Sequence, residues 1–270
     1  MTARSNADLI SGQTRPDAHE SIFGRAEELE HLRQRLAQRR SLLLHGPAGV
    51  GKTLLLSAAL LHCPDALYSH SNPTPQALFR SLAELLLAAR NPVLARSCSN
   101  GSASLQAKSA VSLKGLVRDA LLNSRYLIVL DHLMRPSQAL AAAIRELMLN
   151  CSVPVIAVAR SAHMEDVGFV SPLLPDRRDK LLLPNFDPEV AEQFAATFAR
   201  KEGLQADNLG QFLARVVEYS EGNPGAMLKM IRLGRDPKYF HENQIKITPL
   251  YIDYKMSTIS EQSGSRTLPK

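Results

Sequence analysis

The sequence predicts an α/β fold in which a parallel sheet flanked by helices is followed by a small helical lid. Three observations indicate this fold. Short apolar runs suited to buried strands alternate with longer stretches of helical periodicity as far as residue 184. A glycine-rich segment with the sequence GPAGVGKT joins the first of these runs to the helix after it. Beyond Asn185 the pattern changes to helices only.

The composition is that of a globular protein. Hydrophobic residues make up 45% and charged residues 21% of the chain, no stretch is apolar enough to cross a bilayer, and the first twenty residues lack the apolar core of a signal peptide. Three scattered cysteines argue against a disulfide framework, so we expect a cytoplasmic protein with no membrane partner. The net charge of +6 permits association with nucleic acid, but the basic residues are spread along the chain, which favours solvated surface.

Ahead of the glycine-rich segment, the sequence predicts an arm, a helix and a strand. Residues 1–20 show no periodicity and are expected to form a flexible N-terminal arm before a core over residues 21–184. A helix with leucines on one face is expected to end near Arg39, where cations suit the C-terminal dipole. The apolar residues 42–44 are then long enough for one buried strand.

The glycine-rich segment fits the phosphate-binding pattern G-x-x-x-x-G-K-[ST]. Its glycines let the backbone turn N–H groups toward a polyphosphate, and the helix N-terminus adds partial positive charge. Lys52 can reach the β- and γ-phosphates, and the Thr53 hydroxyl can ligate Mg²⁺. Because a strand precedes the segment and a helix follows it, nucleotide binding is favoured over a loop that binds nothing. The candidate nucleotide-binding residues of this segment are Gly46, Pro47, Ala48, Gly49, Val50, Gly51, Lys52, Thr53 and Leu54.

The next elements alternate between strand and helix. Residues 66–68 are expected to form a short strand, and Thr74 and Pro75 suit the N-cap and first position of a helix that runs to about residue 90. The small polar residues 97–109 are expected to form a mobile loop. Another helix is expected over residues 113–123.

The apolar run 126–130 ends in Asp131 and predicts a strand buried on both faces. In a P-loop protein, an aspartate at the end of such a strand lies beside the phosphate loop. There its carboxylate can bind the water molecules that surround Mg²⁺. The candidate metal-binding residues are therefore Thr53 and Asp131. An ordinary strand-ending aspartate would be the favoured interpretation if no phosphate loop preceded it.

A helix over residues 136–149 and strands over residues 153–159 and 180–183 complete the predicted sheet. Gly46, Asp131 and Arg160 all follow predicted strands, so they should meet at the carboxyl edge where parallel sheets bind ligands.

The last part of the chain is expected to hold a helical lid over residues 185–235 and a C-terminal extension over residues 236–270. Short strands are expected at residues 245–248 and 250–252, ahead of a polar, frayed end from about Ser257.

Four motifs together resemble a known family. They are the F-G-R-x-x-E entry from Phe23 to Glu28, the phosphate loop, the strand that ends in aspartate, and the Gly-Asn-Pro of the lid. With them, residues 21–233 resemble P-loop NTPases of the AAA+-related STAND and origin-recognition type. The resemblance implies a P-loop NTPase core that binds ATP and Mg²⁺.

The resemblance also implies roles for single residues. Phe23, Gly24 and Arg25 would lie near the adenine, Pro224 would close the nucleotide pocket from the lid, and Arg160 would be a polar sensor near the γ-phosphate. The candidate catalytic residues are Lys52, Asp131, His132 and Arg160.

His132 departs from the family pattern, because many relatives place a glutamate or aspartate there to orient the attacking water. A neutral imidazole can accept a proton, but it is a different base with a different reach. Hydrolysis is therefore expected to be slow, with Asp65 or Glu165 as alternative acids. Arg177 and Arg178 lie where origin-recognition relatives place a trans-acting arginine finger, although surface charge is the favoured interpretation.

These observations favour an ATP-binding regulatory switch or accessory ATPase whose output passes through a partner protein or self-assembly. An alternative is a DNA-associated ATPase of the origin-recognition or transposition type, although no helix-turn-helix pattern follows the lid. A small-molecule kinase could use the same phosphate loop, but the helical lid argues against it.

Overall fold

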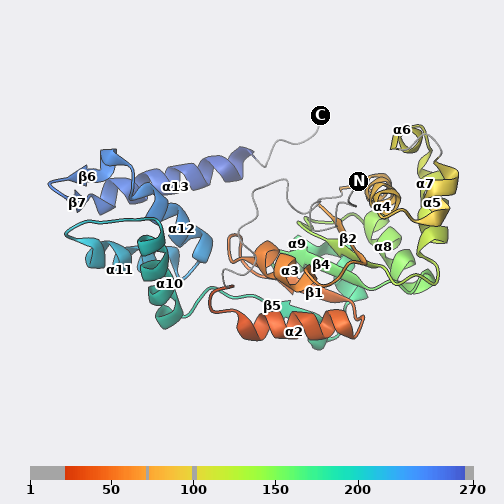
Figure 1. Cartoon of the computed structure of the whole chain (residues 1–270), viewed down its shortest axis with the longest axis horizontal. Helices are drawn as coiled ribbons and strands as arrows, with labels where there is room; N and C mark the ends of the chain where they lie inside the picture. The colour runs from red at the N-terminus through yellow and green to blue at the C-terminus, as the bar shows by residue number, and fades with distance from the viewer. Residues whose placement is uncertain (1–21, 71–72, 99–101, 265–270) are drawn as a thin grey trace. The chain divides into compact units, whose positions relative to one another are not determined.

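The computed structural model describes residues 22–70, 73–98 and 102–264, and the predicted N-terminal arm lies outside these ranges. The chain forms two compact units (Figure 1). The first consists of Met1–Pro47 and Lys52–Leu183, and the second of Ala48–Gly51 and Pro184–Lys270. Four residues of the predicted phosphate loop thus group with the C-terminal unit.

The first unit is built on a five-stranded sheet in the order β2-β3-β4-β1-β5, and all of its strand pairs are parallel. This arrangement confirms the predicted α/β fold class. Strands β3 and β4 are continuous apolar runs and β1 begins with three leucines, because parallel strands are covered on both faces. The strands are β1 Leu42–His45, β2 Ala66–Ser69, β3 Leu127–Leu130, β4 Val155–Ala159 and β5 Lys180–Leu182.

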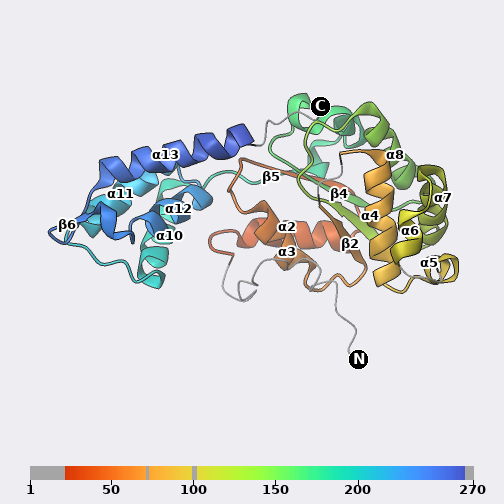
Figure 2. The same cartoon turned by 90° about the horizontal axis from the view of Figure 1, so that it is seen from above.

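Helices connect the strands, and α4 to α7 gather at the end of the sheet beyond β2 (Figures 1 and 2). Several begin at a side chain that accepts a backbone N–H of the first turn, and Thr74 is one such cap, as predicted. The elements are α2 Ala26–Ala37, α3 Lys52–Leu60, α4 Pro75–Ala88, α5 Pro92–Ser97, α6 Ser102–Gln106, α7 Ala110–Leu121, α8 Gln138–Asn150, α9 Met164–Val167, and the 3₁₀ turns η1 Gly168–Leu173 and η2 Arg177–Asp179.

The main core lies between one face of the sheet and helices α4, α5, α7 and α8. Alternate strand residues such as Leu67 and Ile128 belong to this core. Their neighbours Tyr68 and Val129, which are aligned across β2 and β3, therefore point to the opposite face. Asp131 follows Val129 by two residues, so it continues that same face.

The expected mobile loop over residues 97–109 is wrong in part. Helix α6 occupies residues 102–106, and Leu105 is fully buried in the core cluster. This short helix was not predicted because no repeating apolar pattern marks it among the small polar residues; the structure shows Leu105 of this helix in the core.

The second unit packs three helices, a short hairpin and a long final helix. In this unit the ring centroids of Phe186 and Phe194 lie 5.3 Å apart, and those of Phe194 and Phe198 lie 4.4 Å apart. The elements are α10 Pro188–Lys201, α11 Leu209–Ser220, α12 Pro224–Leu233, η3 Pro237–Tyr239, β6 Phe240–His241, β7 Gln244–Ile245 and α13 Ile247–Gly264.

The predicted strands of the C-terminal extension are wrong beyond Ile245, where α13 begins and runs past the expected frayed end. Leu250 and Tyr254, one helical turn apart, are buried, and this spacing belongs to a helix. Pro249 lies in the first turn, where its missing N–H has no intrahelical partner to lose.

Gly222 provides a test of the second unit. Its φ is 74°, and an added Cβ would lie 2.2 Å from the carbonyl oxygen of Phe186. Gly222→Ala is expected to lower the free energy of unfolding by about 1–3 kcal/mol or more, because both the left-handed backbone and the contact oppose a side chain. Urea unfolding measures this loss.

Gly210→Ala is the matched control, because Gly210 lies in α11 and an added Cβ meets nothing within 4 Å. It is expected to leave stability unchanged or to raise it by up to about 1 kcal/mol. Equal stability of both variants would contradict the close approach at Gly222.

Candidate functional site

The predicted phosphate loop connects the end of β1 to the start of α3. Gly49 and Gly51 adopt φ values of 80° and 97°, which only glycine takes up without strain. A Cβ on Gly51 would meet nothing within 4 Å, so the loop has open space beside its backbone. Open backbone of this kind, at the N-terminus of a nine-residue helix, is chemically suited to an anion such as phosphate.

Lys52 is half-buried and donates two hydrogen bonds from Nζ, to the carbonyl oxygens of Gly46 at 2.7 Å and Pro47 at 2.8 Å. Burial lowers the pKa of its ammonium to about 8, an effect that the Asp131 charge opposes and the Arg160 charge reinforces. An anion in the loop would stabilise this charge more strongly than the two carbonyls do.

Asp131 is only 1% exposed and follows β3 at the carboxyl edge of the sheet. The Thr53 hydroxyl donates to its Oδ2 at 3.1 Å, and the backbone N–H of His132 donates to its Oδ1 at 2.8 Å. A hydroxyl and a carboxylate this close form the oxygen-rich donor set that Mg²⁺ prefers. The two predicted metal-binding residues are thus brought together, and they fit the ion.

The Tyr68 hydroxyl also donates to Oδ2 of Asp131, and sequence reasoning missed this contact. Burial, together with this hydrogen bond and the Asp131 charge, raises the pKa of Tyr68 above its usual range, so the phenol remains a donor. The one signal in the sequence was a hydroxyl-bearing ring inside a strand that is buried throughout.

His132 directly follows the buried aspartate, and its side chain is 63% exposed. Its φ of 56° lies in the left-handed region, and its Nε2 lies 3.7 Å from Oδ2 of Asp131. The imidazole is therefore open to solvent beside the candidate metal ligand. Whether it acts as a base stays a prediction.

Arg160 follows β4 and is exposed, and its charge contributes to the lowered pKa of Lys52. The sheet order makes β3, β4 and β1 neighbours, so Asp131, Arg160 and Gly46 follow adjacent strands at one edge, as expected. The sensor role of Arg160 stays a prediction. Of the alternative acids, Asp65 precedes β2 and so lies at the opposite edge, whereas Glu165 lies in α9 beyond β4.

The F-G-R entry precedes α2, which packs against α3. Gly24 adopts a φ of 63°, and the buried Arg25 donates from Nη1 to Oε1 of Glu28 at 2.8 Å. Leu54, in the first turn of α3, is 46% exposed. A place for Phe23, Gly24, Arg25 or Leu54 beside a nucleotide stays a prediction.

In the second unit, the Gly-Asn-Pro sequence meets the apex of the phosphate loop. The Asn223 side chain caps α12 through Oδ1, and its Nδ2 donates to the carbonyl oxygen of Ala48 at 2.9 Å. The Gly225 N–H donates to the carbonyl oxygen of Gly49 at 3.0 Å. Sequence reasoning assigned a role only to Pro224, which is the first residue of α12, and missed its two neighbours.

Arg177 and Arg178 form a 3₁₀ turn before β5, and the carbonyl oxygen of Arg178 accepts a hydrogen bond from Nη2 of Arg35. The Arg178 side chain is 81% exposed, and its Nε lies 3.8 Å from Oδ2 of Asp176. An arginine-finger role for either residue stays a prediction.

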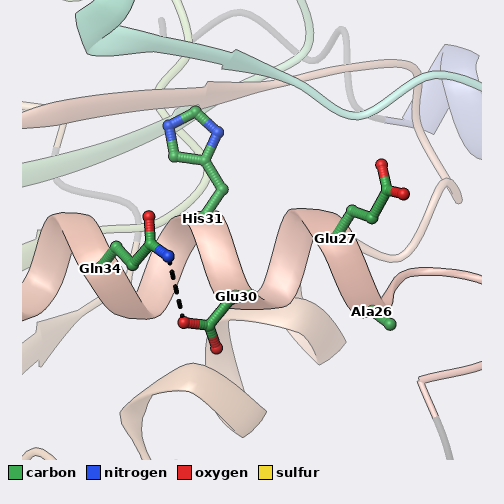
Figure 3. A pocket seen from close by; sticks show the side chains of 5 residues that line it. All are labelled: Ala26, Glu27, Glu30, His31 and Gln34. Carbon is green, nitrogen blue, oxygen red and sulfur yellow. Dashed lines mark hydrogen bonds between the residues drawn. The ribbon is translucent and has the colours of Figure 1, made fainter.

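A pocket lies along α2 and is lined by residues of that helix, none of which belongs to the phosphate loop: Ala26, Glu27, Glu30, His31 and Gln34 (Figure 3). Gln34 Nε2 donates to Glu30 Oε1 at 3.2 Å on its surface, and His31 projects nearby. Across the described ranges, no cluster of three or more His, Cys, Asp or Glu side chains could hold a metal ion. In the same part of the chain, no helix has the length and apolar character needed to span a membrane.

The fold and the phosphate loop together define a P-loop NTPase. Residues 21–158, just over half of the chain, match the model of the AAA ATPase domain. The chain therefore belongs to this AAA ATPase family, in agreement with the resemblance noted from its motifs.

Three similar solved structures carry the same fold. A Walker-type ATPase of Pyrococcus abyssi is 17% identical with a TM-score of 0.62, and the alignment covers 94% of this chain and 79% of that one. The ORC1 protein of Aeropyrum pernix, solved in complex with DNA, is 19% identical with a TM-score of 0.64, over 94% and 71%. A STAND protein of Pyrococcus horikoshii with a tetratricopeptide repeat sensor is 17% identical with a TM-score of 0.50, over 88% and 33%. The comparison with curated proteins finds no match.

Proposed function

We propose that this chain binds ATP with Mg²⁺ and acts as a nucleotide-dependent regulatory switch that hydrolyses ATP slowly. The observation that carries the proposal is the convergence of Lys52, Thr53 and Asp131 beside an open phosphate loop, with an exposed histidine in the position after the aspartate.

Each residue has a defined task in this proposal. The backbone N–H groups of the loop and the Lys52 ammonium bind the β- and γ-phosphates, and Thr53 and Asp131 hold the metal. When bound, Mg²⁺ neutralises the charge that develops on the phosphate oxygens. Arg160 contacts the γ-phosphate, and Leu54 belongs to the nucleotide-binding segment that follows Thr53. The adenine lies near Phe23, Gly24 and Arg25, and Pro224 closes the pocket.

The switch would act through the apex of the phosphate loop. Carbonyl groups of Ala48 and Gly49 accept hydrogen bonds from Asn223 and Gly225 at the start of α12. A nucleotide that reorients this backbone must therefore also change what α12 contacts. This change would in turn alter the binding of a partner protein or the self-assembly of the chain.

The proposed slow hydrolysis is tested by substitutions at His132. If this residue has replaced a water-orienting acid, wild-type turnover is slow and His132→Ala changes it little. His132→Glu is then expected to raise turnover by about tenfold or more, since a positioned base contributes about 10²–10⁴-fold. Steady-state ATPase assays of all three proteins between about pH 5.5 and 8.5 make the comparison.

The competing outcome is that His132 is itself the base. His132→Ala and His132→Glu would then both reduce the wild-type activity. Fast wild-type turnover that survives His132→Ala would remove this residue from the mechanism and contradict the slow switch.

A DNA-associated ATPase is the second candidate function, favoured by the net charge of +6 and by the fold shared with an ORC1 protein solved with DNA. Retention on DNA that weakens steeply with salt, together with stimulation of the ATPase by DNA, would support it. Absence of both effects would exclude the DNA-associated ATPase and favour the switch that acts through a partner protein or self-assembly.

A further inference from the structure

The hydroxyl of Tyr68 makes an unusual contact for a strand residue. Tyr68 is buried on β2, aligned with Val129 of β3, and its phenol donates to Oδ2 of Asp131. The same oxygen accepts the Thr53 hydroxyl at 3.1 Å. One carboxylate oxygen therefore has one donor that is fixed within the sheet and one donor in the phosphate loop's helix.

We propose that Tyr68 is a positioning residue that orients the Asp131 carboxylate for Mg²⁺. This proposal rests on the proposed nucleotide-binding function and assigns a new residue to that site. An ionised carboxylate only accepts hydrogen bonds, and each of its oxygens has two lone-pair sites. The His132 N–H occupies a site on Oδ1, and Tyr68 occupies one on Oδ2. These two donors fix the rotation of the carboxylate.

The remaining lone pair of Oδ2 faces Thr53. Thr53 can keep its proton on Oδ2 while its own lone pair turns to a metal ion, because a hydroxyl has one donor and two acceptor sites. Without the Tyr68 hydroxyl, Oδ2 would lose the donor that β2 supplies, and the carboxylate would be held less firmly in this orientation. The metal site would then lose affinity even though both of its ligands remain.

The test uses the full chain with the single substitution Tyr68→Phe, which removes only the hydroxyl. ATP affinity is measured by calorimetry over a series of Mg²⁺ concentrations and again with EDTA. The expected result is a loss of about tenfold in the Mg²⁺-dependent gain in affinity, as for one hydrogen bond to a charged group. Affinity in EDTA and the thermal midpoint should remain close to wild type.

Two controls separate positioning from packing. Tyr126→Phe removes a hydroxyl from a half-buried tyrosine just before the amino end of β3, and it should change neither affinity. In an Asp131→Asn background, Tyr68→Phe should produce no further loss of Mg²⁺ dependence, because it acts through the missing carboxylate.

Several outcomes would overturn the proposal. If wild type binds MgATP and Tyr68→Phe binds it equally well, Tyr68 has no positioning role and the proposed function stands. Equal losses with Mg²⁺ and with EDTA, or a variant that fails to fold, would make the hydrogen bond purely structural. If wild type binds no ATP, the proposed function fails and this inference fails with it.

Discussion

Lys52→Ala is expected to abolish or severely weaken ATP binding while the protein remains folded. The Lys52 ammonium is the cation within the phosphate loop, and among the described residues it donates its hydrogen bonds to two backbone carbonyls. Loss of a charge-assisted contact to phosphate costs about 1.5–3 kcal/mol, or roughly 10–150-fold in affinity, and several phosphate oxygens share this cation. Calorimetric titration with ATP measures the loss, and circular dichroism and thermal unfolding report on the fold.

Lys114→Ala is the matched control. Nζ of this lysine, in α7, lies 2.6 Å from Oε2 of Glu146 in α8. Removal of this ion pair should leave ATP affinity unchanged. Wild-type affinity in a folded Lys52→Ala protein would refute the assignment of the phosphate loop.

Asp131→Asn is expected to remove most of the Mg²⁺ dependence of nucleotide binding and to leave metal-free binding intact. Asparagine keeps the shape of the side chain, but it loses the charge and one acceptor oxygen. Because three donors converge on the buried carboxylate, we also expect a loss of about 1–3 kcal/mol in the free energy of unfolding. ATP titrations with Mg²⁺ and with EDTA, paired with urea unfolding, measure the two effects.

The control for charge alone is Asp119→Asn, which alters an exposed carboxylate beside Arg118 and should change neither quantity. An equal loss of affinity with and without Mg²⁺ would assign Asp131 a structural role and would exclude it as a metal ligand.

The sheet could be predicted because its strands have a simple pattern. Buried parallel strands such as β3 and β4 are continuous apolar runs, and each ends at a polar residue that marks the carboxyl edge. The phosphate loop adds fixed spacing between glycines, lysine and threonine. Strand ends and motif together predicted that Gly46, Asp131 and Arg160 would share one edge.

The contacts that the sequence could not reveal are tertiary. Tyr68 reaches Asp131 only because β2 is the neighbour of β3. The residues of a strand do not by themselves determine which strand pairs with it. Asn223 meets Ala48 across 175 residues of chain. Helix α13 was mistaken for strand because Ile245 and Ile247, and then Leu250 and Ile252, alternate with other residues as in a strand. The buried pair Leu250 and Tyr254, one helical turn apart, carries the helical spacing that this alternation masked.

The order of strands has a consequence for how this site comes into being as the chain is synthesised. The strand that leads into the phosphate loop, β1, is bordered by β4 and β5, the last two strands of the sheet to be made. The Ser41 hydroxyl, just before β1, accepts the backbone N–H of Val155, 114 residues later. During synthesis on the ribosome, the three leucines of β1 therefore have no strand to pair with while β2 and β3 emerge. Such long-range pairing slows folding and leaves the apolar run open to chaperones in the meantime.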